Sequence, residues 1–331
     1  PGPGEFGHET WENDAWEWTG DISSWAPLSA DPDLGLVYVP TNGATQDYYG
    51  GFRPGDNLFS TSLIALDVET GERAWHFQFV KHDIWNFDTP QVPVLADVMI
   101  DGVETPILAQ ATKQAFLYVL NRETGEPIWP MEEREVPQSL IPGEHLSETQ
   151  IFPTRPAAYD MQGLTEDDLV DYSPELRQQA IEALEDFQIG PLFLPPLQRD
   201  NPLGKRAAFW CPADVGGTNI DGTPAFDPET GIIYVPSQKG CSARIIIPGP
   251  EKDDGGVAED LTEQPTGTTI TDWVPGPAAS PGRVDGLPLW KAPYSKITAI
   301  DLNTGDHLWW IPIGDTPRNV LDHPALAGQP D

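Results

Sequence analysis

A motif that occurs three times constrains the fold of this chain more than any other feature. The pattern Ala-x-Asp-x-x-Thr-Gly-x-x-x-Trp occupies residues 65–75 and recurs at 119–129, with Val119 and Asn121 as its variants, and at 299–309. In each copy an apolar run precedes the Thr-Gly pair and a second run begins at the Trp, which predicts strand, tight turn and strand. The copies indicate a repeat protein whose Trp side chains pack against neighbouring units.

A second repeat interleaves with the first. Residues 31–40, Asp-Pro-Asp-Leu-Gly-Leu-Val-Tyr-Val-Pro, match residues 227–236, Asp-Pro-Glu-Thr-Gly-Ile-Ile-Tyr-Val-Pro, and each predicts a hairpin turn and a short buried strand. The 31 Gly and 36 Pro among 331 residues suit many short strands, and the 12 Trp argue against disorder. We therefore predict an all-β protein of small sheets stacked around an axis, a β-propeller.

One segment departs from the β pattern. Residues 137–156 are rich in Pro and polar residues, and 174–187 are predicted to form an amphipathic helix, because Leu176, Ala180 and Leu184 recur at helical spacing. We expect residues 137–205 to be an excursion within one propeller unit, 1–331. A further Gly-, Pro- and Asp-rich loop is expected over about 248–290.

Charge and cysteine content limit the partners and the compartment. The 18 basic and 52 acidic residues give a net charge of −34, which repels phosphate backbones and argues against nucleic acid as a partner. No apolar run is long enough to predict a membrane span. Cys211 and Cys241 lack metal-ligand spacing, and a disulfide in an oxidising compartment and two independent thiols are equally compatible with the sequence.

The stretch from Phe79 to Pro90, read together with Lys113, is the candidate floor of an active site. It places ionisable residues directly after a strand and around the aromatic anchor Trp85, and Lys113 stands alone between Thr and Gln just before another apolar strand. Lys81 and His82 add charge here, but we expect neither to take part in chemistry.

Several of these motifs together resemble the quinoprotein dehydrogenases that use pyrroloquinoline quinone (PQQ). The resemblance is carried by the Trp repeats and by residues 23–29, 48–57, 82–88 and 111–113, and residues 127–138 are similar to the branch that contains glucose dehydrogenases. It implies an eight-bladed β-propeller, of which this chain would hold about half to two thirds, with a mostly helical insertion. The other blades of the same protein would lie outside the chain.

The resemblance also implies roles for individual residues. Trp25 matches the indole on which the flat quinone stacks, Ser23 a nearby hydrogen-bonding position, and Lys113 the basic residue that contacts the quinone oxygens. Asn219 resembles a further cofactor-binding amide. Asn42 resembles a ligand of Ca²⁺, an ion that takes oxygen donors, although Asn-Gly is also an ordinary turn and the order Asn42-Gly43 is reversed in many members.

Asn86 is the departure from the family pattern that bears most on chemistry. The family usually has Asp here as catalytic base and metal ligand, whereas an amide cannot accept a proton at neutral pH. Asn86 could still bind Ca²⁺ through its carbonyl oxygen. Asp88 is our candidate base because it would face the same side of an extended segment, and Asp83 is the second choice. An impaired or altered enzyme is the third interpretation.

The function implied by the resemblance is the oxidation of an aldose or an alcohol. Hydride would pass to PQQ, polarised by Ca²⁺ and Lys113, and electrons would continue to ubiquinone or cytochrome c in the periplasm, with or without an inner-membrane anchor outside this chain. A non-catalytic propeller that keeps only the repeats is the main alternative. A Ca²⁺-dependent hydrolase would need paired carboxylates in one cleft, which the many acidic residues allow.

Overall fold

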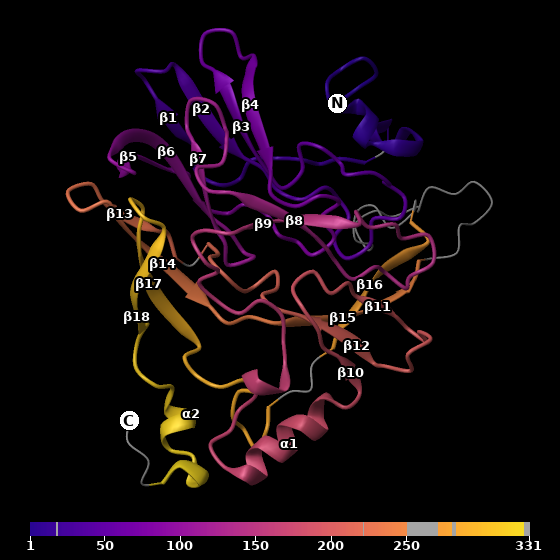
Figure 1. Ribbon diagram of the computed structural model, residues 1–331. Coiled ribbons are helices and arrows are strands. Elements are labelled where there is room, and N and C mark those ends of the chain that lie inside the picture. The colour runs from indigo at the N-terminus through magenta and orange to yellow at the C-terminus, as the bar shows by residue number, and fades with distance from the viewer. Residues whose placement is uncertain (18, 221, 250–270, 280–282, 328–331) are drawn as a thin grey trace.

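The computed structural model describes the whole chain except residues 18, 221, 250–270, 280–282 and 328–331, and it is built mainly of β-sheets (Figure 1). Residues 250–270 and 280–282 of the loop expected at 248–290 therefore lie outside the described residues. Between them the structure has a strand, β16 (Trp273–Ala278), paired with β15 (Ser242–Pro248), so this part is not loop. No helix in the described ranges is both long and apolar enough to cross a membrane.

Three antiparallel sheets carry the two sequence repeats and form the blades of a propeller. The first has the strand order β1-β2-β3-β4, the second β5-β6-β7 and the third β13-β14-β17-β18. Ile128 N donates to Val119 O over 3.0 Å, so the segment after β7 extends the second blade. The strands are β1 Ser29–Asp31, β2 Leu36–Pro40, β3 Ser62–Asp67, β4 Arg73–Gln78, β5 Val94–Ile100, β6 Val103–Ala111, β7 Leu117–Asn121, β13 Ala225–Asp227, β14 Ile232–Gln238, β17 Ser295–Asp301 and β18 Asp306–Pro312.

The repeated Asp or Asn explains why each motif makes a tight turn. Asp67 Oδ1 accepts hydrogen bonds from Glu69 N over 3.0 Å and from Thr70 N over 2.8 Å, and Gly71 follows at φ 73°, in the left-handed region that favours glycine. The side chain thereby closes the turn between β3 and β4. The strands predicted from both copies of the second repeat and from the copies of the first at 65–75 and 299–309 are confirmed. The strand expected to begin at Trp129 is not formed, and Pro127 makes only an isolated bridge with Leu120.

The segment between the second and third blades is less helical than expected. Residues 137–205 contain one α-helix, α1 (Pro174–Leu184), and one short 3-10 turn, η3 (Glu166–Asp168), beside three short strands. The predicted helix is confirmed: the Ser173 hydroxyl caps its first turn, and its apolar face is buried. Prolines and polar residues fill the rest of the segment, so little of it can continue as helix.

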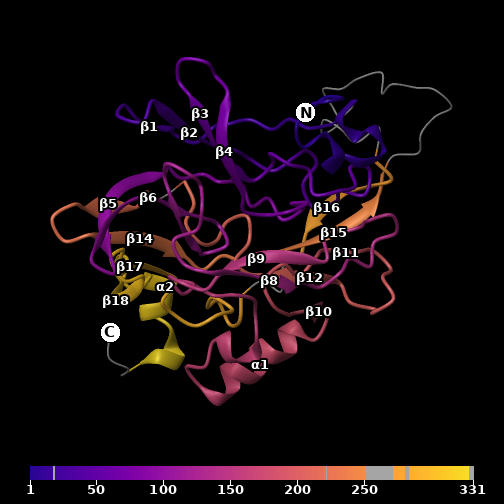
Figure 2. The same cartoon turned by 45° about the horizontal axis from the view of Figure 1, so that its top comes forward.

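A fourth sheet and a separate hairpin complete the β structure. The fourth sheet pairs β10-β12-β15-β11, with β16 on β15, and α1 lies at the opposite end of the molecule from β1–β4 (Figures 1 and 2). The remaining elements are β8 Met131–Glu135 and β9 Thr149–Pro153 in the hairpin, β10 Phe187–Gln188, β11 Leu197–Gln198, β12 Ala207–Trp210, β15 Ser242–Pro248 and β16 Trp273–Ala278, with η1 His8–Thr10, η2 Glu12–Glu17, α2 Arg318–Leu321 and η4 Pro324–Leu326.

The two cysteines form a disulfide. Cys211, just after β12, is bonded to Cys241, just before β15, and these strands pair in the fourth sheet. Of the two alternatives left open by the sequence, the structure has the disulfide. Such bonds persist in oxidising compartments.

Candidate active site

The loop from Phe79 to Pro90 is organised around the carboxylate of Asp83. Asp83 Oδ1 accepts from Trp85 N over 2.8 Å, and Asp83 Oδ2 accepts from Phe87 N over 2.9 Å and from the Thr61 hydroxyl over 2.6 Å. Burial raises the pKa of Asp83 against the lowering effect of the hydrogen bond from Thr61. Asp83 is only 1% exposed, so its geometry is that of a residue that shapes the loop.

Asn86 and Lys113 meet at the turn of this loop. Lys113 follows β6, is buried, and donates from Nζ to both the backbone O and the side-chain Oδ1 of Asn86, each over 2.9 Å. Asn86 has φ 59°, a left-handed conformation that Asn adopts more readily than most residues. This backbone geometry turns both oxygens of Asn86 toward one ammonium group.

Asp88 joins the same cluster. Its Oδ2 lies 3.4 Å from Lys113 Nζ, and its Oδ1 accepts from Gly43 N over 2.9 Å. The side chain is 16% exposed, so Asp88 is more accessible than Asp83. The structure therefore brings together Asn86, Asp88 and Lys113, the three residues for which the sequence predicted a catalytic role.

Asp47 is a further member of the cluster that the sequence analysis missed. Its Oδ2 accepts from Asn86 Nδ2 over 2.7 Å. Burial raises the pKa of Asp47 to about 6, the hydrogen bond from Asn86 lowers it, and the charges of Asp83 and Asp88 raise it. Asp47 lies only five residues after Asn42, between two motifs of the sequence analysis, but no local pattern singles it out.

Of the expected quinone-binding residues, Ser23 contacts Asn42, whose neighbour Gly43 belongs to the cluster. Asn42 Oδ1 accepts from Ser23 N, Asn42 N donates back to Ser23 O over 3.1 Å, and the next residue, Gly43, contacts Asp88. Trp25 is 47% exposed, which leaves much of its indole open. Ser23 is thus linked to Lys113 through Asn42, Gly43 and Asp88, whereas no contact of Trp25 with these residues is seen among the described residues, and its stacking role stays a prediction.

The segment that carries Asn219 packs against the backbone of Lys113. Gly217 packs so closely on the backbone of Lys113 that a Cβ at this glycine would lie 2.1 Å from Lys113 O. Asn219 lines an adjoining cavity of about 190 Å³, and its Nδ2 donates to Asp214 O over 2.9 Å. Asn219 O accepts from Gln91 Nε2 over 2.5 Å. The carboxamide of Asn219 is therefore already oriented by the protein.

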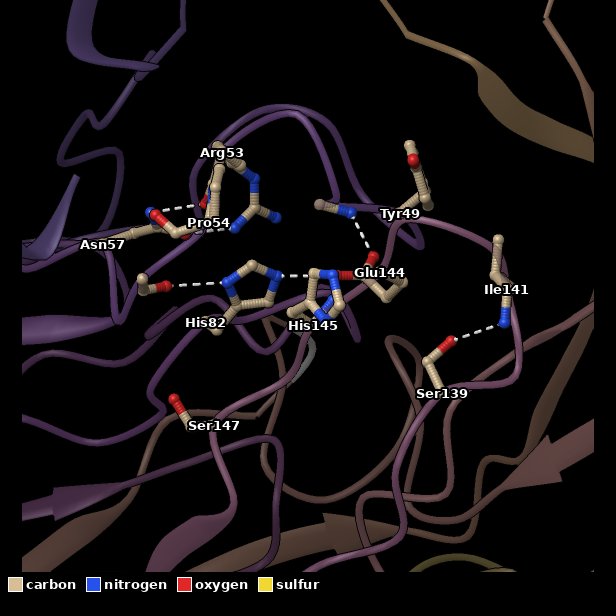
Figure 3. A network of polar contacts seen from close by, with 12 residues as sticks. Tyr49, Arg53, Pro54, Asn57, His82, Ser139, Ile141, Glu144, His145 and Ser147 are labelled. Atoms are coloured by element: carbon tan, nitrogen blue, oxygen red, sulfur yellow. Dashed lines mark hydrogen bonds and ion pairs between the residues drawn. The ribbon is translucent and has the colours of Figure 1, made fainter. Parts of the chain in front are cut away.

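A buried contact between His82 and Glu144 anchors the start of the loop. His82 Nε2 lies 2.9 Å from Glu144 Oε1, and His82 Nδ1 lies 2.7 Å from Gly55 O (Figure 3). Glu144 Oε2 accepts from Gly50 N over 2.5 Å. Burial raises the pKa of Glu144, but the hydrogen bond and charge of His82 outweigh this and hold it below its usual value. Arg53, also fully buried, donates to Asp83 O over 2.7 Å.

The donors in this cluster are the kind that Ca²⁺ takes. Asn42 and Asn86 supply carboxamide oxygens and Asp47 and Asp88 supply carboxylates. Within the described residues no group of three or more His, Cys, Asp or Glu side chains converges as in a metal centre. The donor chemistry fits Ca²⁺. In the structure Asn42 Oδ1 accepts a hydrogen bond from Ser23 N, and Asn86 Oδ1 accepts one from Lys113 Nζ.

The amino-acid sequence matches one known protein family over nearly its whole length. Residues 1–330 match the family model described as PQQ: glucose/ethanol/alcohol dehydrogenase, β-propeller domain. The chain is 32% identical over 324 residues to the glycerol dehydrogenase large subunit of Gluconobacter oxydans, covering 91% of this chain and 41% of that protein. It is 30% identical over 319 residues to the quinoprotein glucose dehydrogenase of Escherichia coli, covering 91% of this chain and 37% of that protein.

Two solved structures share the fold. A europium-containing methanol dehydrogenase superposes with a TM-score of 0.57 at 21% identity, covering 94% of this chain and 42% of that one. A quinohemoprotein alcohol dehydrogenase from Comamonas testosteroni gives a TM-score of 0.54 at 20% identity, covering 92% of this chain and 37% of that one. At this identity the likeness concerns the fold alone. The chain spans about two fifths of the length of the relatives that it matches.

Proposed function

The chain belongs to the PQQ glucose/ethanol/alcohol dehydrogenase β-propeller family, and on this premise we propose that it contributes the catalytic loop of a PQQ-dependent dehydrogenase. The substrate class is an aldose, such as glucose, or a primary or secondary alcohol. The observation that carries the proposal is the contact of the buried Lys113 Nζ with Asn86 and Asp88.

The protein's own groups would do three things in this reaction. Trp25 would stack on the planar cofactor, with Ser23 and Asn219 as polar neighbours. Lys113, which is buried and therefore poorly screened by water, would stabilise negative charge on the cofactor oxygens. When bound, PQQ would supply the two-electron acceptor that takes hydride from the substrate carbon.

Asp88 is the proposed proton acceptor for the substrate hydroxyl. Its carboxylate is partly exposed and lies beside Lys113, whereas the oxygens of Asp83 already accept three hydrogen bonds. Proton transfer to Asp88 accompanies loss of hydride from the adjacent carbon, which leaves a carbonyl product. Asn42 and Asn86 are the proposed Ca²⁺ ligands, in keeping with their oxygen donors.

Reduced cofactor must pass its electrons on, and we propose ubiquinone or cytochrome c as the acceptor in the periplasm. The disulfide Cys211–Cys241 supports an oxidising compartment. An inner-membrane association would depend on a segment outside this chain.

The test is reconstitution of the full-length protein with PQQ and Ca²⁺, followed by dye reduction with a panel of sugars and alcohols. Lys113→Ala and Asp88→Asn should each reduce kcat by at least about a hundredfold, a loss typical of removing a charge-stabilising group or a general base. The matched control is Lys81→Ala, because among the described residues the Lys81 ammonium group pairs with the exposed Glu133. Wild-type protein that neither binds PQQ nor reduces the dye would contradict the proposal.

A non-catalytic propeller remains the alternative from another class. It needs the Trp and Thr-Gly repeats, which pack the blades, but it has no use for a buried lysine held by Asn86 and Asp88. A folded protein in which Lys113→Ala changes neither PQQ binding nor any activity would favour this scaffold.

A further inference from the structure

Asp47 and Asn86 are 39 residues apart in the chain, and their side chains meet in the candidate site. The Asn86 carboxamide donates through Nδ2 to Asp47 over 2.7 Å and accepts through Oδ1 from Lys113 over 2.9 Å. A carboxylate accepts and an ammonium group donates, so these two partners allow one orientation of the carboxamide. Asn86 is held from both ends.

Asp47 depends on this contact as much as Asn86 does. Among the residues that the structure describes, Asn86 is the one that donates a hydrogen bond to the carboxylate of Asp47. The nearby charges are Arg53, which is attractive, and Asp83 and Asp88, which are repulsive. A carboxylate in such a place has little reason to be there for packing alone.

We propose that Asp47 is a positioning residue of the reaction assigned above: it orients the Asn86 carboxamide, and Asn86 in turn holds the ammonium group of Lys113 where it meets the cofactor. The inference rests on the proposed function for the role of Lys113. The geometry of the three side chains stands without it.

The contact between positions 47 and 86 limits how many carboxylates this pair of side chains can carry. In the protein without Ca²⁺, Asn86→Asp alone would place two carboxyl groups in contact. Ionised together they repel strongly, and a proton shared between them is lost as pH rises. Exchanging the two residues keeps one carboxylate and one carboxamide. The hydrogen bond then runs in the opposite direction, from position 47 to position 86. We therefore expect one carboxylate at positions 47 and 86 to be compatible with a stable fold, and two carboxylates there to destabilise it.

The experiment compares Asp47→Ala, Asn86→Asp and the double variant Asp47→Asn, Asn86→Asp in the full-length protein. kcat is measured with PQQ and Ca²⁺, and Tm is measured without Ca²⁺, because a bound dication would offset a second carboxylate. Asp47→Ala should lower kcat by about tenfold or more through misplacement of Lys113, with KM within about twofold. Its Tm should be unchanged or raised, because a poorly paired buried charge is removed. A role in packing alone would lower Tm and leave kcat intact. Asp101→Asn, on an exposed turn, is the control that removes one charge elsewhere.

Asn86→Asp should lower Tm by several degrees, on the order of 5 °C, and also lower kcat. The exchange should restore Tm, and bring kcat to within about threefold of wild type. Losses that add in the exchange, or a gain of activity in Asn86→Asp alone, would overturn the inference. If wild-type protein shows no activity, the proposed function fails, but the Tm values still test the contact between Asp47 and Asn86. A Tm restored in the exchange variant supports the contact, and additive losses of Tm refute it.

Discussion

The indole of Trp75 lies directly over Gly125, so closely that a Cβ on this glycine would lie 2.6 Å from the ring. Trp75 ends one copy of the repeat and Gly125 lies in the turn of the next. Trp75 Nε1 also donates to Arg122 O in that turn over 3.1 Å. The third copy repeats the arrangement, because a Cβ on Gly305 would lie 3.1 Å from Trp129. The motif thus encodes contacts between blades as well as the turn within each.

Gly125→Ala should therefore lower the free energy of unfolding by more than the left-handed backbone conformation of this residue alone would explain. At φ 78° an L-residue costs about 1–2 kcal/mol, and overpacking against Trp75 adds roughly 1–3 kcal/mol. Gly71→Ala is the matched control, since Gly71 has φ 73° in an equivalent turn and a Cβ there meets no atom within 4 Å. Urea unfolding gives both free energies. Equal losses would contradict the role of the Trp contact.

Removing the buried carboxylate of Glu144 should be costly for a different reason. Glu144→Ala leaves His82 Nε2 and Gly50 N buried without their acceptor, and each unsatisfied buried group typically costs about 1–3 kcal/mol. Glu133→Ala breaks the exposed pair with Lys81, for which about 0–1 kcal/mol is usual. Because the pKa of Glu144 is lowered in the folded state, its stabilisation is present above the pKa of the unfolded chain and is lost as pH falls through the folded value. Unfolding at pH 7 and pH 3 measures both effects, and similar losses in the two variants would refute the distinction.

Reduction of Cys211–Cys241 should weaken the fourth sheet. A bond that closes a loop of 30 residues stabilises by roughly 3–4 kcal/mol in the chain-entropy model. Tm should fall when a reductant is added to the wild type and stay constant in the Cys211→Ala, Cys241→Ala double variant. A wild-type Tm that does not respond to complete reduction, verified by thiol titration, would show that the bond adds no stability.

The sequence predicted what local patterns can encode. The Asp-x-x-Thr-Gly turns and the helix at α1 follow from side chains a few residues apart, and the joint position of Asn86 and Lys113 follows from a family motif. The contacts of Asp47 with Asn86 and of His82 with Glu144 join residues that are 39 and 62 positions apart, and all four residues lie in loops. No periodicity relates such residues. The sequence analysis therefore missed the carboxylate that accepts from Asn86, and it did not predict the structural contact of His82, a residue expected to take no part in the chemistry.

Stability should also reveal the ionisation of Asp47. Its pKa is about 6 in the folded protein, whereas an unfolded Asp titrates at about 3.9. Below about pH 4 both states hold the proton. As pH rises from about 4 to 6 the unfolded chain loses its proton first, so the folded state is progressively disfavoured, by at most about 3 kcal/mol and by less to the extent that solvent reaches the side chain.

Asp47→Asn removes this loss and should become more stable, relative to wild type, as pH rises through this range. Asp67→Asn is the control of opposite sign, because turn hydrogen bonds lower the pKa of Asp67, so that this carboxylate stabilises at higher pH. Urea unfolding at pH 4, 5, 6 and 7.5 measures the differences, and a constant difference between Asp47→Asn and wild type would show that the pKa of Asp47 is not raised.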